Sequence, residues 1–168
     1  MPARPDVAFL RQVKIFQDIS EPHLVALWGR LQERRLRKGE VLFRAGDHGD
    51  EVFLIRTGSI VVSSPVQGRV EQVLAHLGPG DFFGEMSLFD EEPRSATIQG
   101  ATESRLLSMS RASLFEFIDS NPRAAAALLY QVVRVMSSRL RASTELVAEV
   151  TRWGLEATGL DVEQTLPE

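Results

Sequence analysis

The residues with the clearest chemical potential stand in one stretch, residues 80–97. Gly84 has no side chain, so the backbone can come close to a ligand there. Arg94 offers a planar set of N–H donors that fits two phosphate oxygens, and Ser95 adds a hydroxyl beside it. Glu85 only accepts hydrogen bonds when ionised, so it suits a sugar hydroxyl and would repel a phosphate. These residues together predict a site for a small phosphorylated ribose.

A short helical turn is predicted directly after Gly84, over residues 85–88. The first backbone N–H groups of such a turn have no partner within it, and the helix dipole favours an anion at the same end. We therefore expect Met86 and Ser87 to line the phosphate part of the site.

The order of residues in this stretch carries a family resemblance. Phe-Gly-Glu-Met-Ser-Leu at 83–88 is followed after a short gap by Pro-Arg-Ser-Ala-Thr at 93–97. This pattern resembles the phosphate-binding cassette of cyclic-nucleotide-binding domains, the family of bacterial catabolite activators and cyclic-nucleotide-gated regulators. The resemblance implies that Arg94 and Ser95 hold a cyclic phosphate and that Glu85 accepts the ribose 2′-hydroxyl. It implies cyclic AMP as the ligand, with cyclic GMP left open.

Composition sets outer limits on the protein. The chain has 168 residues, 43% of them apolar, which is enough for one compact domain and an appendage. The net charge of −4 gives no electrostatic reason to expect nucleic acid. The absence of cysteine excludes disulfides. Neither a signal peptide nor a membrane-spanning run is evident, so a cytoplasmic protein is expected.

The hydrophobic pattern predicts an α+β fold within one domain, residues 1–153. Apolar residues at helical spacing predict a helix over 6–19 and a second one from Ser20, which is a good N-cap, so that N-terminal helices occupy 6–31. Short apolar runs between glycine turns over 33–109 predict an antiparallel sandwich or barrel. Further helices are expected over 111–153, followed by a short flexible tail, 154–168. The resemblance implies that the strands form a jelly-roll barrel.

Other residues have two interpretations. In the family, apolar residues inside the barrel pack the sugar and base, and Val62 and Leu74 fall at the matching places; both could instead be simple core residues. The basic run 34–38 is interpreted as the solvated face of a strand. His48 and His76 have no evident second ligand, so neither a metal nor haem is expected. We find no nucleophile–base pair and expect no enzyme.

A long helix is predicted from Pro122 to about residue 153, because the segment is rich in alanine, leucine and arginine. Its apolar residues repeat at alternating spacings of four and three, as in a coiled-coil seam. The seam positions are Leu129, Val133, Met136, Leu140, Ser143, Val147 and Val150. A barrel of this size cannot cover so long a seam, so we expect pairing with a second copy. A helix folded back on its own barrel is the alternative.

Ser143 and Thr144 resemble the hydroxyl pair that contacts adenine from the dimerisation helix of the bacterial catabolite activators, where the order is Thr-Ser. Hydroxyls both donate and accept, so they suit the edge of adenine. The alternative is a pair of helix hydroxyls bonded to their own backbone or to water.

The resemblance stops before a DNA-binding domain, because residues 154–168 are too few and too acidic for a helix-turn-helix reader. We therefore expect no direct DNA binding, and either a stand-alone sensor with an unknown protein partner or a piece of a longer chain. A ligand-free protein–protein interaction module of the same fold is the alternative function.

Overall fold

The computed structural model describes residues 4–66, 70–89 and 92–158. The chain forms two compact units that meet between Leu129 and Tyr130. The first unit holds every strand in the described part of the chain and most of its helices. The second unit continues the long C-terminal helix.

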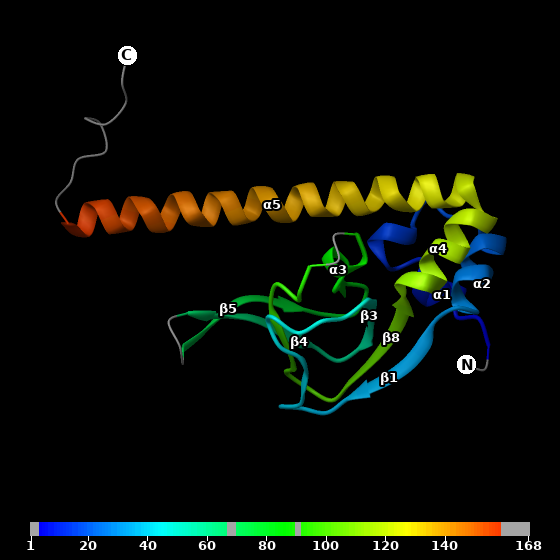
Figure 1. Ribbon diagram of the computed structural model, residues 1–168, viewed down its shortest axis with the longest axis horizontal. Helices are drawn as coiled ribbons and strands as arrows, with labels where there is room; N and C mark the ends of the chain where they lie inside the picture. The colour runs from blue at the N-terminus through cyan, green and yellow to red at the C-terminus, as the bar shows by residue number, and fades with distance from the viewer. Residues whose placement is uncertain (1–3, 67–69, 90–91, 159–168) are drawn as a thin grey trace, which may run out of the picture. The chain divides into compact units, whose positions relative to one another are not determined.

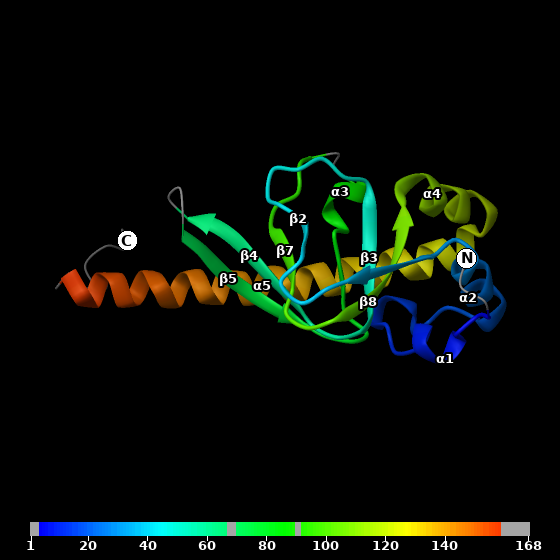
Figure 2. The ribbon, with the colours of Figure 1, turned by 90° about the horizontal axis from the view of Figure 1, so that it is seen from below.

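Within the described residues, eight strands form two antiparallel sheets in the first unit (Figures 1 and 2). The first sheet has the order β1-β8-β3-β6, and its strands are β1 (Gln32–Leu36), β8 (Ser104–Ser110), β3 (Glu51–Thr57) and β6 (Phe82–Phe83). The second has the order β2-β7-β4-β5, with β2 (Val41–Phe43), β7 (Thr97–Gly100), β4 (Ile60–Val66) and β5 (Val70–Leu77). Because neighbours far apart in sequence pair, this is the predicted jelly roll.

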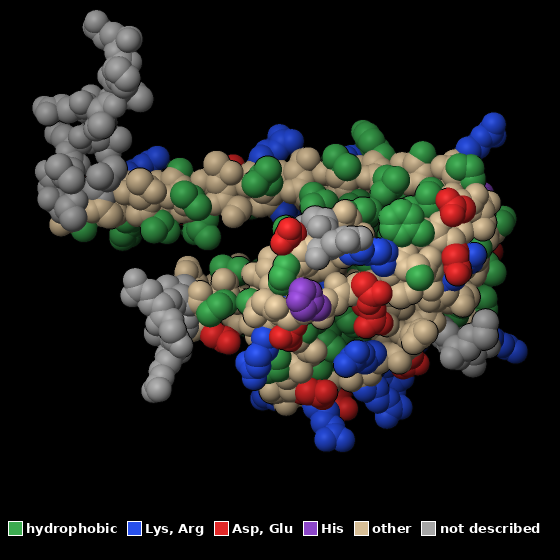
Figure 3. Space-filling view, in the orientation of Figure 1, with side chains coloured by type: hydrophobic (Ala, Val, Ile, Leu, Met, Phe, Trp, Pro, Cys, Tyr) green, Lys and Arg blue, Asp and Glu red, His purple; other side chains and the backbone are tan. Residues whose placement is uncertain are grey.

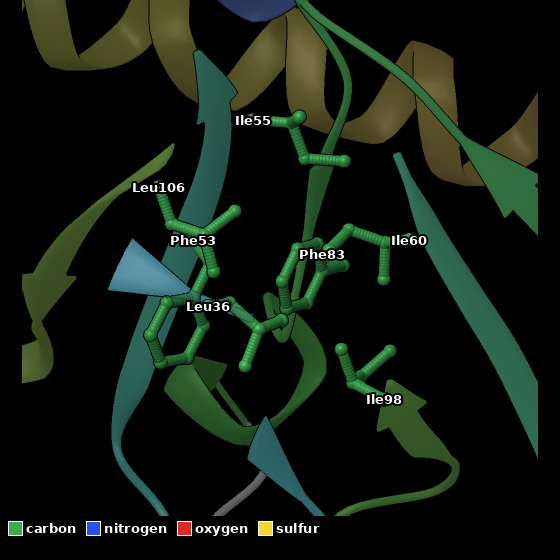
Figure 4. Close-up of a cluster of buried hydrophobic side chains, with 7 residues drawn as sticks. All are labelled: Leu36, Phe53, Ile55, Ile60, Phe83, Ile98 and Leu106. Atoms are coloured by element: carbon green, nitrogen blue, oxygen red, sulfur yellow. The ribbon is translucent and has the colours of Figure 1, made fainter. Parts of the chain in front are cut away.

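The core lies between the two sheets (Figure 4). Its buried side chains come from both sheets, namely Leu36, Phe53, Ile55, Ile60, Phe83, Ile98 and Leu106. Large apolar side chains that point inward from facing sheets exclude water together, which stabilises the roll. The predicted α+β class, with an antiparallel jelly roll and a long C-terminal helix, is confirmed.

The predicted helix over residues 6–19 is wrong in its continuity. The chain forms a four-residue helix, α1 (Val7–Leu10), and then a separate 3₁₀ turn, η1 (Lys14–Phe16). Val13 is extended (φ −75°, ψ 118°) and breaks the helix. Val13, Phe16 and Ile19 are nevertheless buried, because consecutive turns can present the same spacing of apolar residues as one helix.

Two further helices of the first unit begin directly after a serine. α2 (Glu21–Trp28) starts after Ser20, as predicted, although the Ser20 hydroxyl lies 2.7 Å from Nδ1 of His23 rather than on the backbone. α4 (Arg111–Ser120) starts after Ser110, whose Oγ accepts from the N–H of Ser113. These helices gather with α1 at one end of the roll (Figures 1 and 2).

The long helix, α5, runs from Pro122 to Thr158 and so extends beyond the predicted end at residue 153. Gly154 costs a helix about 1 kcal/mol relative to alanine. Glu156 and Ala157, which follow it, are good helix formers, and the helix continues through the glycine. The helical segment 154–158 therefore corrects the predicted tail, and residues 159–168 lie outside the described part of the chain.

Two further predictions concern exposed surfaces. Arg34, Arg35, Arg37 and Lys38 are all exposed, which agrees with a solvated strand face. Among the helices of the described residues, none is both long enough and apolar enough to cross a bilayer.

Candidate functional site

The site is built on a turn that only glycine adopts easily. β6 pairs with β3 through Phe53 and Phe83, and the chain then leaves the sheet at Gly84 with φ +81°. A Cβ at this position would lie 2.9 Å from the carbonyl oxygen of Glu51 and 2.8 Å from Nη1 of Arg94. The missing side chain is thus what lets backbone and guanidinium meet.

Arg94 reaches this turn from the segment before β7, and only 5% of the residue is exposed. Its Nη1 donates to the carbonyl oxygens of Glu51 (2.9 Å) and Gly84 (3.1 Å). Its backbone makes two hydrogen bonds to the loop that precedes β3. The N–H of Arg94 donates to the carbonyl of Asp47, and its carbonyl accepts from the N–H of Gly46, each at 2.8 Å. Backbone and side chain of Arg94 are therefore both fixed before any ligand arrives.

One buried nitrogen of the guanidinium lacks a hydrogen-bond partner in the described part of the chain. Nε of Arg94 is buried and finds no acceptor among the described residues. Buried donors of a charged group are almost always paired, because an unmade bond costs the group its hydration. An anion that reached this Nε–H would supply the acceptor that the described residues do not.

The remaining sides of the guanidinium are closely packed. Cζ of Arg94 lies 4.2 Å from the centre of the Phe43 ring. A Cβ on Gly49 would fall 2.5 Å from Nη2 and 2.7 Å from Nε of Arg94. An aromatic ring and a glycine thus define where the guanidinium can lie.

The electrostatic setting of Arg94 contains opposing effects. Burial of the guanidinium lowers the pKa of Arg94 from its ordinary value. Nearby carboxylates oppose this shift, those of Glu51, Asp50, Asp47 and Glu85. The cation is thus placed among carboxylates inside a poorly hydrated site, where an added anion would interact with it more strongly than in water.

The cassette residues predicted from sequence come together around Gly84. Glu85 is 8% exposed, and Ser87 is buried. The predicted turn is observed one residue later, as α3 (Met86–Phe89), beside β3. Met86 and Ser95 are exposed and adjacent, with the Ser95 hydroxyl 3.6 Å from Sδ of Met86. This group offers donors and one carboxylate, which suits binding an anionic, hydroxyl-bearing ligand.

Val62 and Leu74 differ from one another. Val62, in β4, is partly buried and packs against the core cluster. Leu74, in β5, is 49% exposed, so the alternative that it is a core residue is wrong. Val62 pairs with Ala75 and Ser63 pairs with Val73, which leaves Leu74 as the extra residue of a β-bulge and turns it out of the regular alternation.

Ser143 and Thr144 belong to the second unit, so their role in the site stays a prediction. Both residues are exposed. Oγ1 of Thr144 donates to the carbonyl oxygen of Leu140 at 3.0 Å, which is the backbone-bonded arrangement given above as the alternative.

Sequence reasoning missed Phe43, Gly49 and the carbonyl of Glu51. Each lies more than forty positions from Arg94 in the chain, and nothing in the local pattern links them to it. The only available signal was the glycine-rich segment 46–49 between two predicted strands, which marked a tight loop but not its occupant.

Metal ligands do not gather in the described ranges, where no group of three His, Asp or Glu residues could hold an ion. His48 and His76 are both exposed.

The sequence profile of the cyclic nucleotide-binding domain matches residues 33–121, just over half of the chain. The chain belongs to this family. A CRP-like cAMP-activated global transcriptional regulator of Mycobacterium tuberculosis is 32% identical over 141 residues, which cover 84% of this chain and 61% of that protein. A cyclic nucleotide-gated potassium channel of Mesorhizobium japonicum is 40% identical over 113 residues, or 67% of this chain and 30% of the channel.

Solved structures agree with this assignment. A cyclic nucleotide-binding domain from Methylobacillus flagellatus has a TM-score of 0.76 and 26% identity, and the match covers 84% of this chain and 80% of that one. The chain thus covers most of a domain of this family, but less than two thirds of the regulator and the channel.

The packing of Gly49 against Arg94 can be tested directly. Gly49 does not have a positive φ, so Gly49→Ala fits the backbone but places its methyl group on the guanidinium. We expect Arg94 to be displaced, with a loss of about 1–3 kcal/mol in the free energy of unfolding because its hydrogen bonds are broken. Nε–H exchange of Arg94, followed by NMR, should become faster.

Gly78→Ala is the matched control. A Cβ there meets nothing within 4 Å, so the stability should change by less than about 0.5 kcal/mol and the Arg94 signal should not move. A protected Arg94 Nε–H in Gly49→Ala would contradict the packing described here.

Proposed function

We propose that this chain binds a 3′,5′-cyclic nucleotide, with cyclic AMP preferred, and acts as a ligand-sensing regulatory module. The observation that carries the proposal is the buried guanidinium of Arg94 with its unpaired Nε–H, held inside the cassette. A cyclic phosphate carries one negative charge and supplies the missing acceptor. The match of the family profile over the cassette supports the same ligand class.

Arg94 would bind the phosphate through charge-assisted hydrogen bonds, joined by Ser95 and by backbone N–H groups of the turn after Gly84. Such bonds contribute about 1.5–3 kcal/mol each. The donors are already in place, so little conformational entropy is lost on binding. The phosphate is therefore the part of the ligand that should dominate affinity.

Glu85 would accept the ribose 2′-hydroxyl. It follows Gly84 directly and is largely buried, so water would compete only weakly for the hydrogen bond that its carboxylate accepts from the ribose. A carboxylate here also disfavours ligands that place a second phosphate near the sugar, because like charges would repel. Glu85 thus favours a cyclic monophosphate with a free 2′-hydroxyl.

The base would be held by apolar and hydroxyl residues. We propose that Val62 and Leu74 pack on the sugar and base, and that Ser143 and Thr144 contact the base edge. The exposed Leu74 side chain is available for such packing. The Mycobacterium tuberculosis relative is named for activation by cAMP, which supports adenine; hydroxyls also suit guanine, so cyclic GMP is the competing ligand.

We also propose that α5 pairs with the same helix of a second copy. Its apolar side chains at Val133, Leu140, Val147 and Val150 are exposed, Leu140 by 69%, and green side chains follow the helix in Figure 3. Exposed apolar residues at heptad spacing are stabilised by a partner helix. If ligand affinity differs between two positions of this helix, binding shifts their populations and supplies a signal to an output protein.

The phosphate contact is tested by isothermal titration of ligand-stripped protein with cyclic AMP and cyclic GMP. We expect saturable binding of cyclic AMP, weaker binding of cyclic GMP, and at least tenfold weaker binding by Arg94→Ala and Arg94→Lys, because about 1.4 kcal/mol corresponds to tenfold. Circular dichroism and thermal unfolding would establish that both variants fold.

Arg34→Ala is the control, since Arg34 is an exposed arginine on β1 and should bind as the parent does. No heat with either nucleotide in folded, ligand-free parent protein would refute the proposal and favour a docking module without a ligand.

The sugar contact is tested by a cycle of Glu85→Gln and 2′-deoxy cyclic AMP. Glu85→Gln should weaken cyclic AMP binding by about 1–3 kcal/mol, because a hydrogen bond to a charged acceptor is replaced by a neutral one. The same substitution should change the affinity for the 2′-deoxy ligand much less. The coupling energy from the four titrations is the measurement, and a coupling near zero would remove Glu85 from the ribose.

Pairing of α5 is tested by light scattering coupled to gel filtration. Leu140→Glu places a charge in the centre of the apolar seam, so we expect a monomer where the parent is a dimer. Ser138→Glu adds the same charge at an exposed position off the seam and should leave the dimer intact. A parent protein that is monomeric at micromolar concentration would exclude the pairing.

A further inference from the structure

Phe43 is the last residue of β2, and the guanidinium of Arg94 lies over its ring. The guanidinium carbon lies 4.2 Å from the ring centre of Phe43 and 5.8 Å from that of Phe53. Both distances fall within the range of cation–π attraction, which strengthens where the cation is removed from water. Arg94 is almost fully buried, so this attraction acts under favourable conditions.

The Phe43 ring is itself fixed by a cluster of aromatic rings. Phe43 lies 6.0 Å from Phe53 and 6.2 Å from Phe83, with tilted planes. Phe53 and Phe83 stack at 5.3 Å across the β3–β6 pair, and both belong to the core cluster in Figure 4. Contacts of this kind favour particular ring orientations, so the surface beneath Arg94 is rigid.

These contacts decide the orientation of the guanidinium. The group is planar, with donors along its edges and two faces that make no hydrogen bonds. Nη1 donates to the carbonyls of Glu51 and Gly84, and Cζ lies over the ring of Phe43. Contacts at Nη1 and at Cζ together restrict the rotation of the guanidinium, and with it the direction of the Nε–H.

We propose that Phe43 is a positioning residue of the anion site: its ring holds the Arg94 guanidinium by cation–π stacking, so that Nε–H is presented to the ligand phosphate. The proposal rests on the proposed function and adds to it a residue outside the cassette. It also assigns a reason for arginine at position 94, because a lysine ammonium lacks the flat face that stacks on a ring.

Packing alone would make a different prediction. If Phe43 only filled space, any change that preserved the ring volume would leave ligand affinity unchanged. If the ring attracts the cation through its π-electrons, affinity should follow the negative charge of the ring face. Fluorination withdraws that charge with little change of shape and therefore separates the two roles.

The experiment replaces Phe43 by mono-, di- and trifluorophenylalanine and measures cyclic AMP affinity in each protein. We expect affinity to fall stepwise with fluorination, and Phe43→Leu to bind about fivefold or more weakly than the parent. Phe43→Tyr retains the ring face and should bind within about twofold of the parent, which is the conservative rescue. Phe16→Leu, a buried substitution in η1, controls for a general loss of stability and should not change affinity.

A double-mutant cycle with Arg94→Lys tests the same contact from the side of the arginine. In that background, Phe43→Leu should weaken cyclic AMP binding less than it does beside Arg94, because a lysine ammonium keeps the charge but lacks the flat face that stacks on the ring. Equal affinity across the fluorinated series in folded protein would overturn the role of Phe43 while leaving the nucleotide site standing. Absence of cyclic AMP binding by the parent protein would instead refute the proposed function on which the role depends.

Discussion

The structure of the site depends on the burial of one guanidinium. Only 5% of Arg94 is exposed to solvent. A buried charge is tolerated only with nearby dipoles or counter-charges. Carbonyls of β3 and of the turn at Gly84 supply the dipoles, and carboxylates around the loop oppose the loss of charge. The roll is therefore arranged so that the loop before β3, the start of β3 and the turn at Gly84 converge on one side chain.

Two glycines make this convergence possible for different reasons. Gly84 is required by its positive φ and by the closeness of the Glu51 carbonyl, so it is a requirement of backbone shape. Gly49 has an ordinary conformation and is required only by the space that the guanidinium fills. A side chain at position 84 would strain the fold itself, whereas one at position 49 would move the arginine within an otherwise intact fold.

The cassette could be predicted from the sequence because its chemistry is local. Gly84, Glu85 and Arg94 lie within one short stretch, and their donor and acceptor properties follow from residue type. Phe43 and Gly49 could not be assigned to the site, because their contacts with Arg94 depend on how the sheets close. The helix predicted over 6–19 failed for a related reason: apolar spacing reports which residues are buried, and the extended Val13 shows that burial does not require one continuous helix.

Under the proposed function, the ligand phosphate adds a hydrogen bond to a guanidinium that already makes two. Nη1 already has two acceptors and Nε has none, so a phosphate can add a bond at Nε while the carbonyl contacts persist. A bond to the phosphate would offset the cost of leaving a buried charged donor without an acceptor. Because Glu51 begins β3 and Gly84 leads into α3, a shift of the guanidinium on binding would act on both elements through these two hydrogen bonds. The Phe43 ring lies beneath the arginine, and the turn at Gly84 is bonded to it. The phosphate contact would therefore be the point at which ligand binding acts on the surrounding segments.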